Sequence, residues 1–141
     1  MVKEHLNENG VMVVNMNMRG NNEGNINQYL SDTIASVFDH IVTVDVDGST
    51  NRELYASSNA DMVKTLENNA NETGHSDLRD MMLHVADTSS VYEAGDYIMT
   101  DDKAPVELLG MQVIDQLIQG EVAYYKDIFE KDGINGLLES L

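Results

Sequence analysis

The stretch Gly10-Val11-Met12-Val13-Val14 decides the fold of this 141-residue chain. Its four consecutive apolar side chains predict a strand that is covered on both faces, as in the sheet of an α/β protein. Residues 2–9 have the pattern of the last turns of a helix that closes at Gly10. The chain is therefore expected to begin inside an α/β architecture.

Helix and strand patterns alternate after this strand. Residues 19–25 have the composition of a loop, and apolar side chains at helical spacing in residues 26–38 predict a crossover helix. Two short strands, residues 40–46 and 53–58, flank turn residues at 47–51 and predict a hairpin. The expected order is a parallel pair of strands joined by the crossover helix, followed by an antiparallel return.

The rest of the chain is predicted to be helical. One helix starts near Met62 and loses its apolar face at residues 68–71, and another is centred on residues 78–85. Pro105 opens a longer helix, because the first turn tolerates a proline. Residues 121–141 are expected to form two short amphipathic pieces separated at Gly133.

No internal repeat and no long linker divides the sequence. Residues 1–141 are therefore predicted to form a single α/β domain, with about three strands in a mixed sheet, the last of them antiparallel, and helices on its faces.

The charge balance limits the expected partners. Lys and Arg number 8 against 25 Asp and Glu, a net charge of -17, so the surface repels nucleic acid and anionic lipid. This charge favours a cationic ligand such as an amine or a metal ion, or it serves only to keep the chain in solution. The chain has no cysteine and no apolar run of about 20 residues, which is typical of a cytoplasmic protein without membrane contact.

The segment from Thr100 to Glu107 carries most of the functional information. Asp101 and Asp102 precede the predicted helix, and Glu107 lies in its first turn. Such carboxylates can simply satisfy the free N–H groups and the positive end of the helix dipole. Alternatively, they can face a pocket and bind an ammonium group through charge-assisted hydrogen bonds.

Two segments resemble one known family. Residues 100–107 are similar to the TDD-x-APVE signature near the C-terminus of spermidine synthase-like proteins, and residues 9–15 are similar to the pGGVlvvN strand of the same family. The two matches occur in the family's order, and the resemblance extends from about Val2 to Leu117. The chain is thus identified as the C-terminal part of a spermidine synthase-like protein.

The resemblance implies a partial Rossmann-like methyltransferase fold, whose last strand runs antiparallel between its two neighbours. Members transfer an aminopropyl group from decarboxylated S-adenosylmethionine to an amine, or are methyltransferase-like relatives. Asp101, Asp102 and Glu107 would then line the amine side of the substrate mouth in the full-length parent.

The family's donor-binding and catalytic motifs have no counterpart here. The Gly-rich nucleotide loop, the acidic residue that binds ribose and the catalytic Asp motif all belong upstream of Val11. Residues 20–24 contain two glycines, but their spacing is not that of a dinucleotide fingerprint. We therefore expect no catalytic residue and no bound cofactor in this chain, while the parent would use S-adenosylmethionine or its decarboxylated form.

Two alternatives remain open at this point. The chain could be an acidic interaction or dimerisation module without catalysis, built on a methyltransferase-derived scaffold. A helical face with Asp77, Asp80, His84 and Asp87 could bind a metal or be merely solvated. In either case the strand edge from Val11 to Asn17 is expected to be open, and it predicts a homodimer through that edge.

Overall fold

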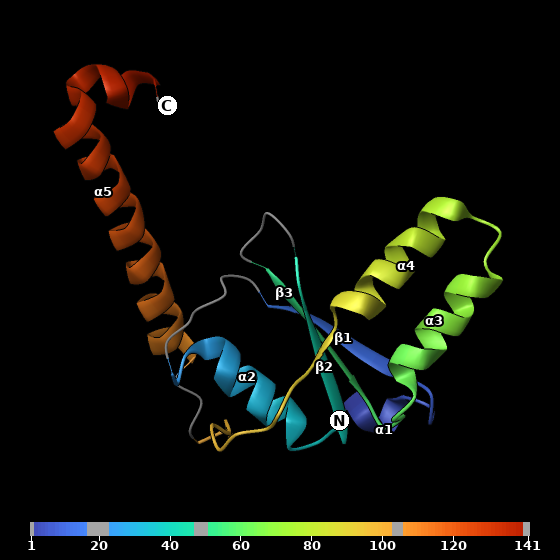
Figure 1. Ribbon diagram of the computed structural model, residues 1–141. Helices are drawn as coiled ribbons and strands as arrows, with labels where there is room; N and C mark the ends of the chain where they lie inside the picture. Colours follow the sequence, from blue (N-terminus) through green and yellow to red (C-terminus); the bar gives the residue numbers. More distant parts are fainter. Residues whose placement is uncertain (1, 17–22, 47–50, 103–105, 140–141) are drawn as a thin grey trace. The chain divides into compact units, whose positions relative to one another are not determined.

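The computed structural model describes residues 2–16, 23–46, 51–102 and 106–139. Its elements are α1 (Val2–His5), β1 (Val11–Met16), α2 (Ile26–Ala35), β2 (His40–Asp45), β3 (Arg52–Ser57), α3 (Met62–Glu72), α4 (Ser76–Thr88), β4 (Ser90–Val91) and α5 (Val106–Glu139) (Figure 1). Contacts group the chain into two compact units, Met1–Lys103 and Ala104–Leu141. Each unit is described by itself, and the single domain expected for residues 1–141 stays a prediction.

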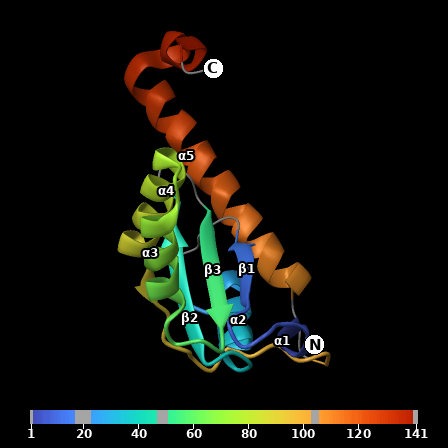
Figure 2. The same ribbon diagram turned by 90° about the vertical axis from the view of Figure 1, so that its right-hand side faces the viewer.

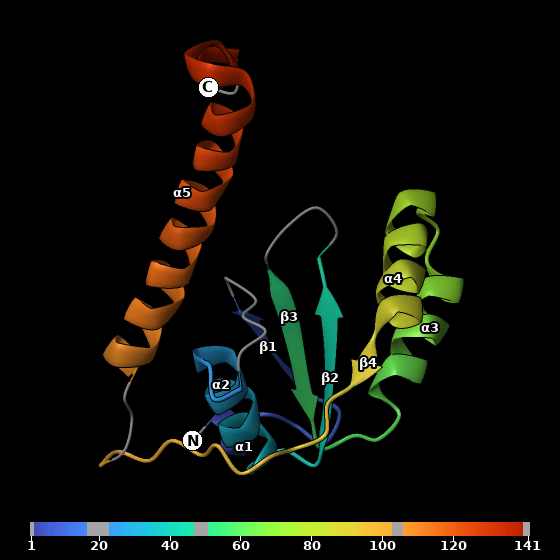
Figure 3. The same ribbon diagram turned by 60° about the vertical axis from the view of Figure 1, so that its left-hand side comes forward.

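The first unit is built on one sheet with the strand order β1-β3-β2-β4. Each pair of neighbours is antiparallel, so β1 and β2 run in the same direction with β3 between them (Figure 3). In this register Leu54 lies between Val14 of β1 and Thr43 of β2. The predicted antiparallel return strand is confirmed, and it occupies the central position between the two strands that α2 connects.

The predicted sheet differs from the observed one in two details. The sheet has four described strands rather than about three, because the two-residue β4 pairs with Val42 and Thr43 of β2. It is also not mixed, because β3 separates the two co-directional strands and leaves no parallel neighbours. A strand of two residues is too short to produce an alternating pattern, which is why the sequence did not reveal it.

Helices lie on both faces of the sheet, with α1 and α2 on one side and α3 and α4 on the other (Figures 2 and 3). The side chains of β1 alternate between these faces, as the pleat of a strand requires. Met12, Val14 and Met16 belong to the core on the α2 side. Val11 and Val13 line a cavity on the side of α3 and α4.

The core on the α2 side is centred on β3. Leu54 and Ala56 are completely buried there and pack with Met16, Phe38 and Ile41. The preceding helix starts at a proper cap, because the Asn25 side chain accepts a hydrogen bond from the Gln28 N–H. The crossover helix is thus confirmed.

The helix α3 is longer than its composition indicates. It was expected to lose its packing at residues 68–71, but it continues to Glu72 and its Ala70 is completely buried. The prediction of an exposed end was wrong because α4 packs antiparallel against α3 (Figure 1). A single small apolar residue is enough for close helix contact.

The second unit is the helix α5. Residues 121–132 continue the helix that starts at Val106, so the separate short piece expected there was wrong. The break at Gly133 is confirmed, with φ 64° and ψ -156°, a conformation that only glycine adopts readily. Pro105, which was expected to start this helix, lies outside the described residues, as do the turn at 47–50 and the loop at 17–22.

Candidate functional site

Asp101 and Asp102 lie in an exposed turn at the end of the first unit. Glu107 is exposed in the first turn of α5, which belongs to the second unit. The two aspartates are therefore adjacent, and the structure does not place Glu107 relative to them. Their assignment to an amine site stays a prediction.

The segment that leads to this turn is fixed to α2 by one buried carboxylate. Asp32 is 1% exposed, although it is ionisable. Its Oδ1 atom accepts hydrogen bonds from the Tyr92 hydroxyl at 2.6 Å and from the Gly95 N–H at 2.9 Å. Its Oδ2 atom accepts one from the Tyr97 N–H at 2.9 Å. Three donors compensate the desolvation of the carboxylate, and they join residues about sixty positions apart.

Close approach to Asp32 requires the glycine at position 95. A Cβ atom there would lie 2.7 Å from the Asp32 Oδ2 atom, a distance that forces a displacement. One helix position further on, the Thr33 hydroxyl oxygen accepts a hydrogen bond from the Met99 N–H at 2.9 Å. The same hydroxyl donates to the Tyr29 carbonyl oxygen at 2.6 Å.

Tyr97 adds an aromatic and a polar contact to the same anchor. Its ring packs edge-on against Tyr29, with 5.0 Å between the ring centroids. Its hydroxyl donates to Glu23 at 3.1 Å. The chain from Tyr92 to Met99 thus follows α2 and delivers Asp101 and Asp102 to a defined place on the first unit.

Sequence reasoning missed Asp32, although one signal was present. An aspartate in the same helix as Leu30 and Ile34 interrupts an apolar pattern, and such an interruption needs a buried partner. The partners are two backbone N–H groups and the tyrosine hydroxyl in residues 92–97, which have no pattern of their own.

Tyr92 provides a pH-dependent readout of this anchor. Burial, and then the hydrogen bond to Asp32, raise the pKa of its hydroxyl from 10.0 to about 12. A folded-state pKa above the unfolded one stabilises the fold fully below pH 10, and this contribution is lost between pH 10 and about 12.

We expect Tyr92→Phe to flatten the loss of stability across this window. Burial also raises the pKa of Tyr55, so the wild type retains some slope from other tyrosines. The difference between wild type and variant isolates Tyr92, measured as urea unfolding at pH 9, 10 and 11. An unchanged slope in the variant would show that Tyr92 is not coupled to Asp32.

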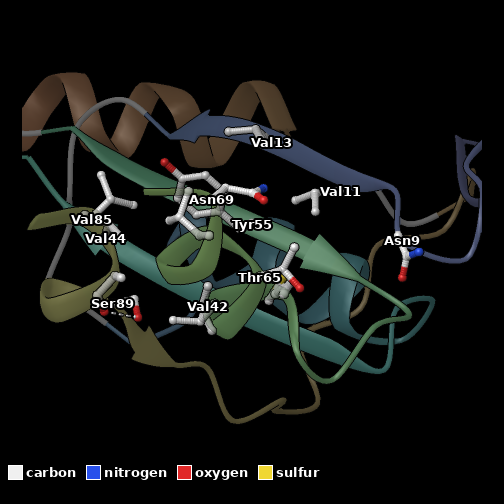
Figure 4. A pocket seen from close by; sticks show the side chains of 14 residues that line it. Asn9, Val11, Val13, Val42, Val44, Tyr55, Thr65, Asn69, Val85 and Ser89 are labelled. Carbon is white, nitrogen blue, oxygen red and sulfur yellow. Dashed lines mark hydrogen bonds between the residues drawn. The ribbon is translucent and has the colours of Figure 1, made fainter. Parts of the chain in front are cut away.

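A cavity of about 330 Å³ lies on the opposite face of the sheet, under α3 and α4 (Figure 4). It is lined by Asn9, Val11, Val13, Val42, Val44, Tyr55, Met62, Val63, Thr65, Leu66, Asn69, Val85, Ala86 and Ser89. None of these residues carries a charge at neutral pH, in a chain with a net charge of -17. The cavity therefore offers no ion-pair partner to a polyamine and no nucleophile for catalysis.

The acidic face of α4 does not form a metal centre in the described part of the chain. No group of three or more His, Cys, Asp or Glu side chains is close enough there to share an ion. Within the same residues, none of the helices combines the length and apolar character that crossing a bilayer requires.

No protein-family profile and no solved structure matches the chain. Over its whole length, however, the chain is similar to a spermidine synthase-like protein, which confirms the resemblance seen in residues 9–15 and 100–107. That relative is the "Probable polyamine aminopropyl transferase" of Bifidobacterium longum (strain NCC 2705). The two are 45% identical over 158 residues, which cover 100% of this chain and 35% of the relative. The chain thus spans about a third of the relative's length.

Proposed function

We propose that the chain is the C-terminal part of a spermidine synthase-like transferase and contributes to its amine side. The observation that carries the proposal is the 45% identity over the entire chain to a polyamine aminopropyl transferase of which it covers 35%. The full-length parent would transfer an aminopropyl or methyl group from an S-adenosylmethionine-type donor to an amine.

The strand order supports this assignment. A strand that runs antiparallel between two co-directional strands is the ending that a methyltransferase fold implies, and β3 has this position. The rest of such a sheet would extend from the free side of β1. In this proposal the chain supplies the closing strands of the parent's sheet.

The acidic turn would bind the cationic acceptor. Asp101 and Asp102 are exposed and adjacent, and a protonated amine gains charge-assisted hydrogen bonds from such a pair. Asp32 would act as a positioning residue, because its three hydrogen bonds hold the segment that precedes the turn. Glu107 would add a third carboxylate if the second unit packs nearby in the parent.

The described residues do not fit the donor. A nucleoside needs a carboxylate for its ribose hydroxyls and a glycine turn at the end of a strand, and the 330 Å³ cavity is lined by neither an acidic residue nor a glycine. The donor site and the catalytic residues would thus lie in the rest of the parent, and this chain alone would not catalyse.

Isothermal titration calorimetry tests this proposal. The purified chain is titrated with S-adenosylmethionine and, separately, with its decarboxylated form. We expect no heat of binding at micromolar concentrations, because the residues that would hold ribose are missing. The folded state of the sample is checked by circular dichroism, so that absence of binding is not confused with absence of structure.

A non-catalytic interaction module is the second candidate, and one feature favours it. The sheet has an unprotected edge at β1, which is a pairing surface irrespective of catalysis. A cytoplasmic location, predicted from the lack of cysteine, belongs to both candidates.

A further inference from the structure

The two edges of the sheet are protected very differently. At one edge β4 has only two residues, Ser90 and Val91, so it offers little backbone for pairing. At the other edge β1 has six residues, Val11–Met16, and pairs in regular register with β3. In the described part of the chain β3 is its only strand neighbour. One row of β1 backbone groups is therefore available to another strand.

The charge distribution makes β1 an exception in this molecule. The segment Val-Met-Val-Val-Asn-Met contains no charged residue, although 25 of the 141 residues are acidic. Natural sheet edges are usually blunted by a lysine, a proline or a bulge, and β1 has none of these. Its Val11 and Val13 side chains are 40% and 53% exposed. This edge is apolar, regular and free of the repulsion that dominates the rest of the surface.

We propose that β1 pairs antiparallel with β1 of a second copy across a two-fold axis, which joins two sheets into one. Two-fold symmetry makes the self-pairing antiparallel, as every other pair in the sheet is. The register that places Val13 opposite Val13 of the second copy pairs Met12 with Val14 and Val11 with Asn15. Apolar side chains then face apolar ones at every position except the last.

The second copy is the occupant that the edge itself selects. Facing residues of an antiparallel pair lie on the same side of the sheet, so the two exposed Val13 side chains cover one another. Both cavities under α3 and α4 would then lie on one face of the joined sheet. The inference does not depend on the proposed transferase activity.

The test introduces a charge at the axis. Val13→Lys keeps a long side chain that is solvated in the monomer, but places two like charges opposite each other in the dimer. We expect sedimentation equilibrium to show a dimer for the wild type and a dissociation constant raised at least about tenfold for this variant. Val91→Lys is the matched control, because it puts the same substitution on the other sheet edge at an 80% exposed site, and its dimer should persist.

A charge swap makes the register itself testable. Val13→Asp should also dissociate, and a one-to-one mixture of Val13→Lys with Val13→Asp should restore the dimer. A monomeric wild type at high concentration would overturn the proposal, as would a dimer that Val13→Lys leaves intact. Loss of the dimer in Val91→Lys would overturn it as well, because the contact would then lie elsewhere.

Discussion

Asp32→Ala is expected to lower the free energy of unfolding by about 3 kcal/mol. The substitution removes the acceptor of the Tyr92 hydroxyl and of the Gly95 and Tyr97 N–H groups. Each donor is left to find water at a site where the carboxylate itself is 1% exposed. Urea unfolding followed by far-ultraviolet circular dichroism measures the loss.

Two further variants separate the anchor from a general effect of charge. Asp32→Asn retains one oxygen acceptor but replaces the second with an amide donor, so about half of the loss should appear. Asp39→Ala removes an aspartate that is 68% exposed and paired only with Lys3, and it should cost less than about 0.5 kcal/mol. Equal effects of Asp32→Ala and Asp39→Ala would contradict the anchor.

Leu54→Ala is expected to cost about 3 kcal/mol. Leu54 is 0% exposed at the centre of the middle strand, where Val14 and Thr43 flank it in the register. Truncation leaves a cavity that a three-strand contact cannot close easily. The free energy of unfolding is measured as for Asp32.

The control for Leu54 is Leu78→Ala on α4, where the side chain is 41% exposed. The same atoms are removed from a site that is partly in water, so the loss should be about 1 kcal/mol or less. If both substitutions cost the same, β3 is not the central strand of a packed sheet.

The main elements of the first unit follow from local patterns in the sequence. The apolar run at β1, the helical spacing of α2 and the turn-linked strands β2 and β3 each produce a local signal. Their antiparallel return also follows from the hairpin. The insertion of β3 between β1 and β2 depends on contacts between distant residues, and only the resemblance to a known family indicated it.

The acidic pair was predictable, and its support was not. Asp101 and Asp102 stand out because they are adjacent and belong to a recognisable motif. Asp32 acts through backbone N–H groups of Gly95 and Tyr97, which any residue type can supply. The packing of α4 that buries Ala70 is likewise tertiary, and the Asn-rich composition around that residue points the other way.

The calorimetric titration with the S-adenosylmethionine-type donors tests the central claim most directly. The full-length relative from Bifidobacterium longum, titrated in parallel, serves as the positive control. The account predicts that the relative binds its donor whereas these 141 residues do not. Micromolar binding by this chain alone would contradict it, because the nucleotide site would then lie within the chain.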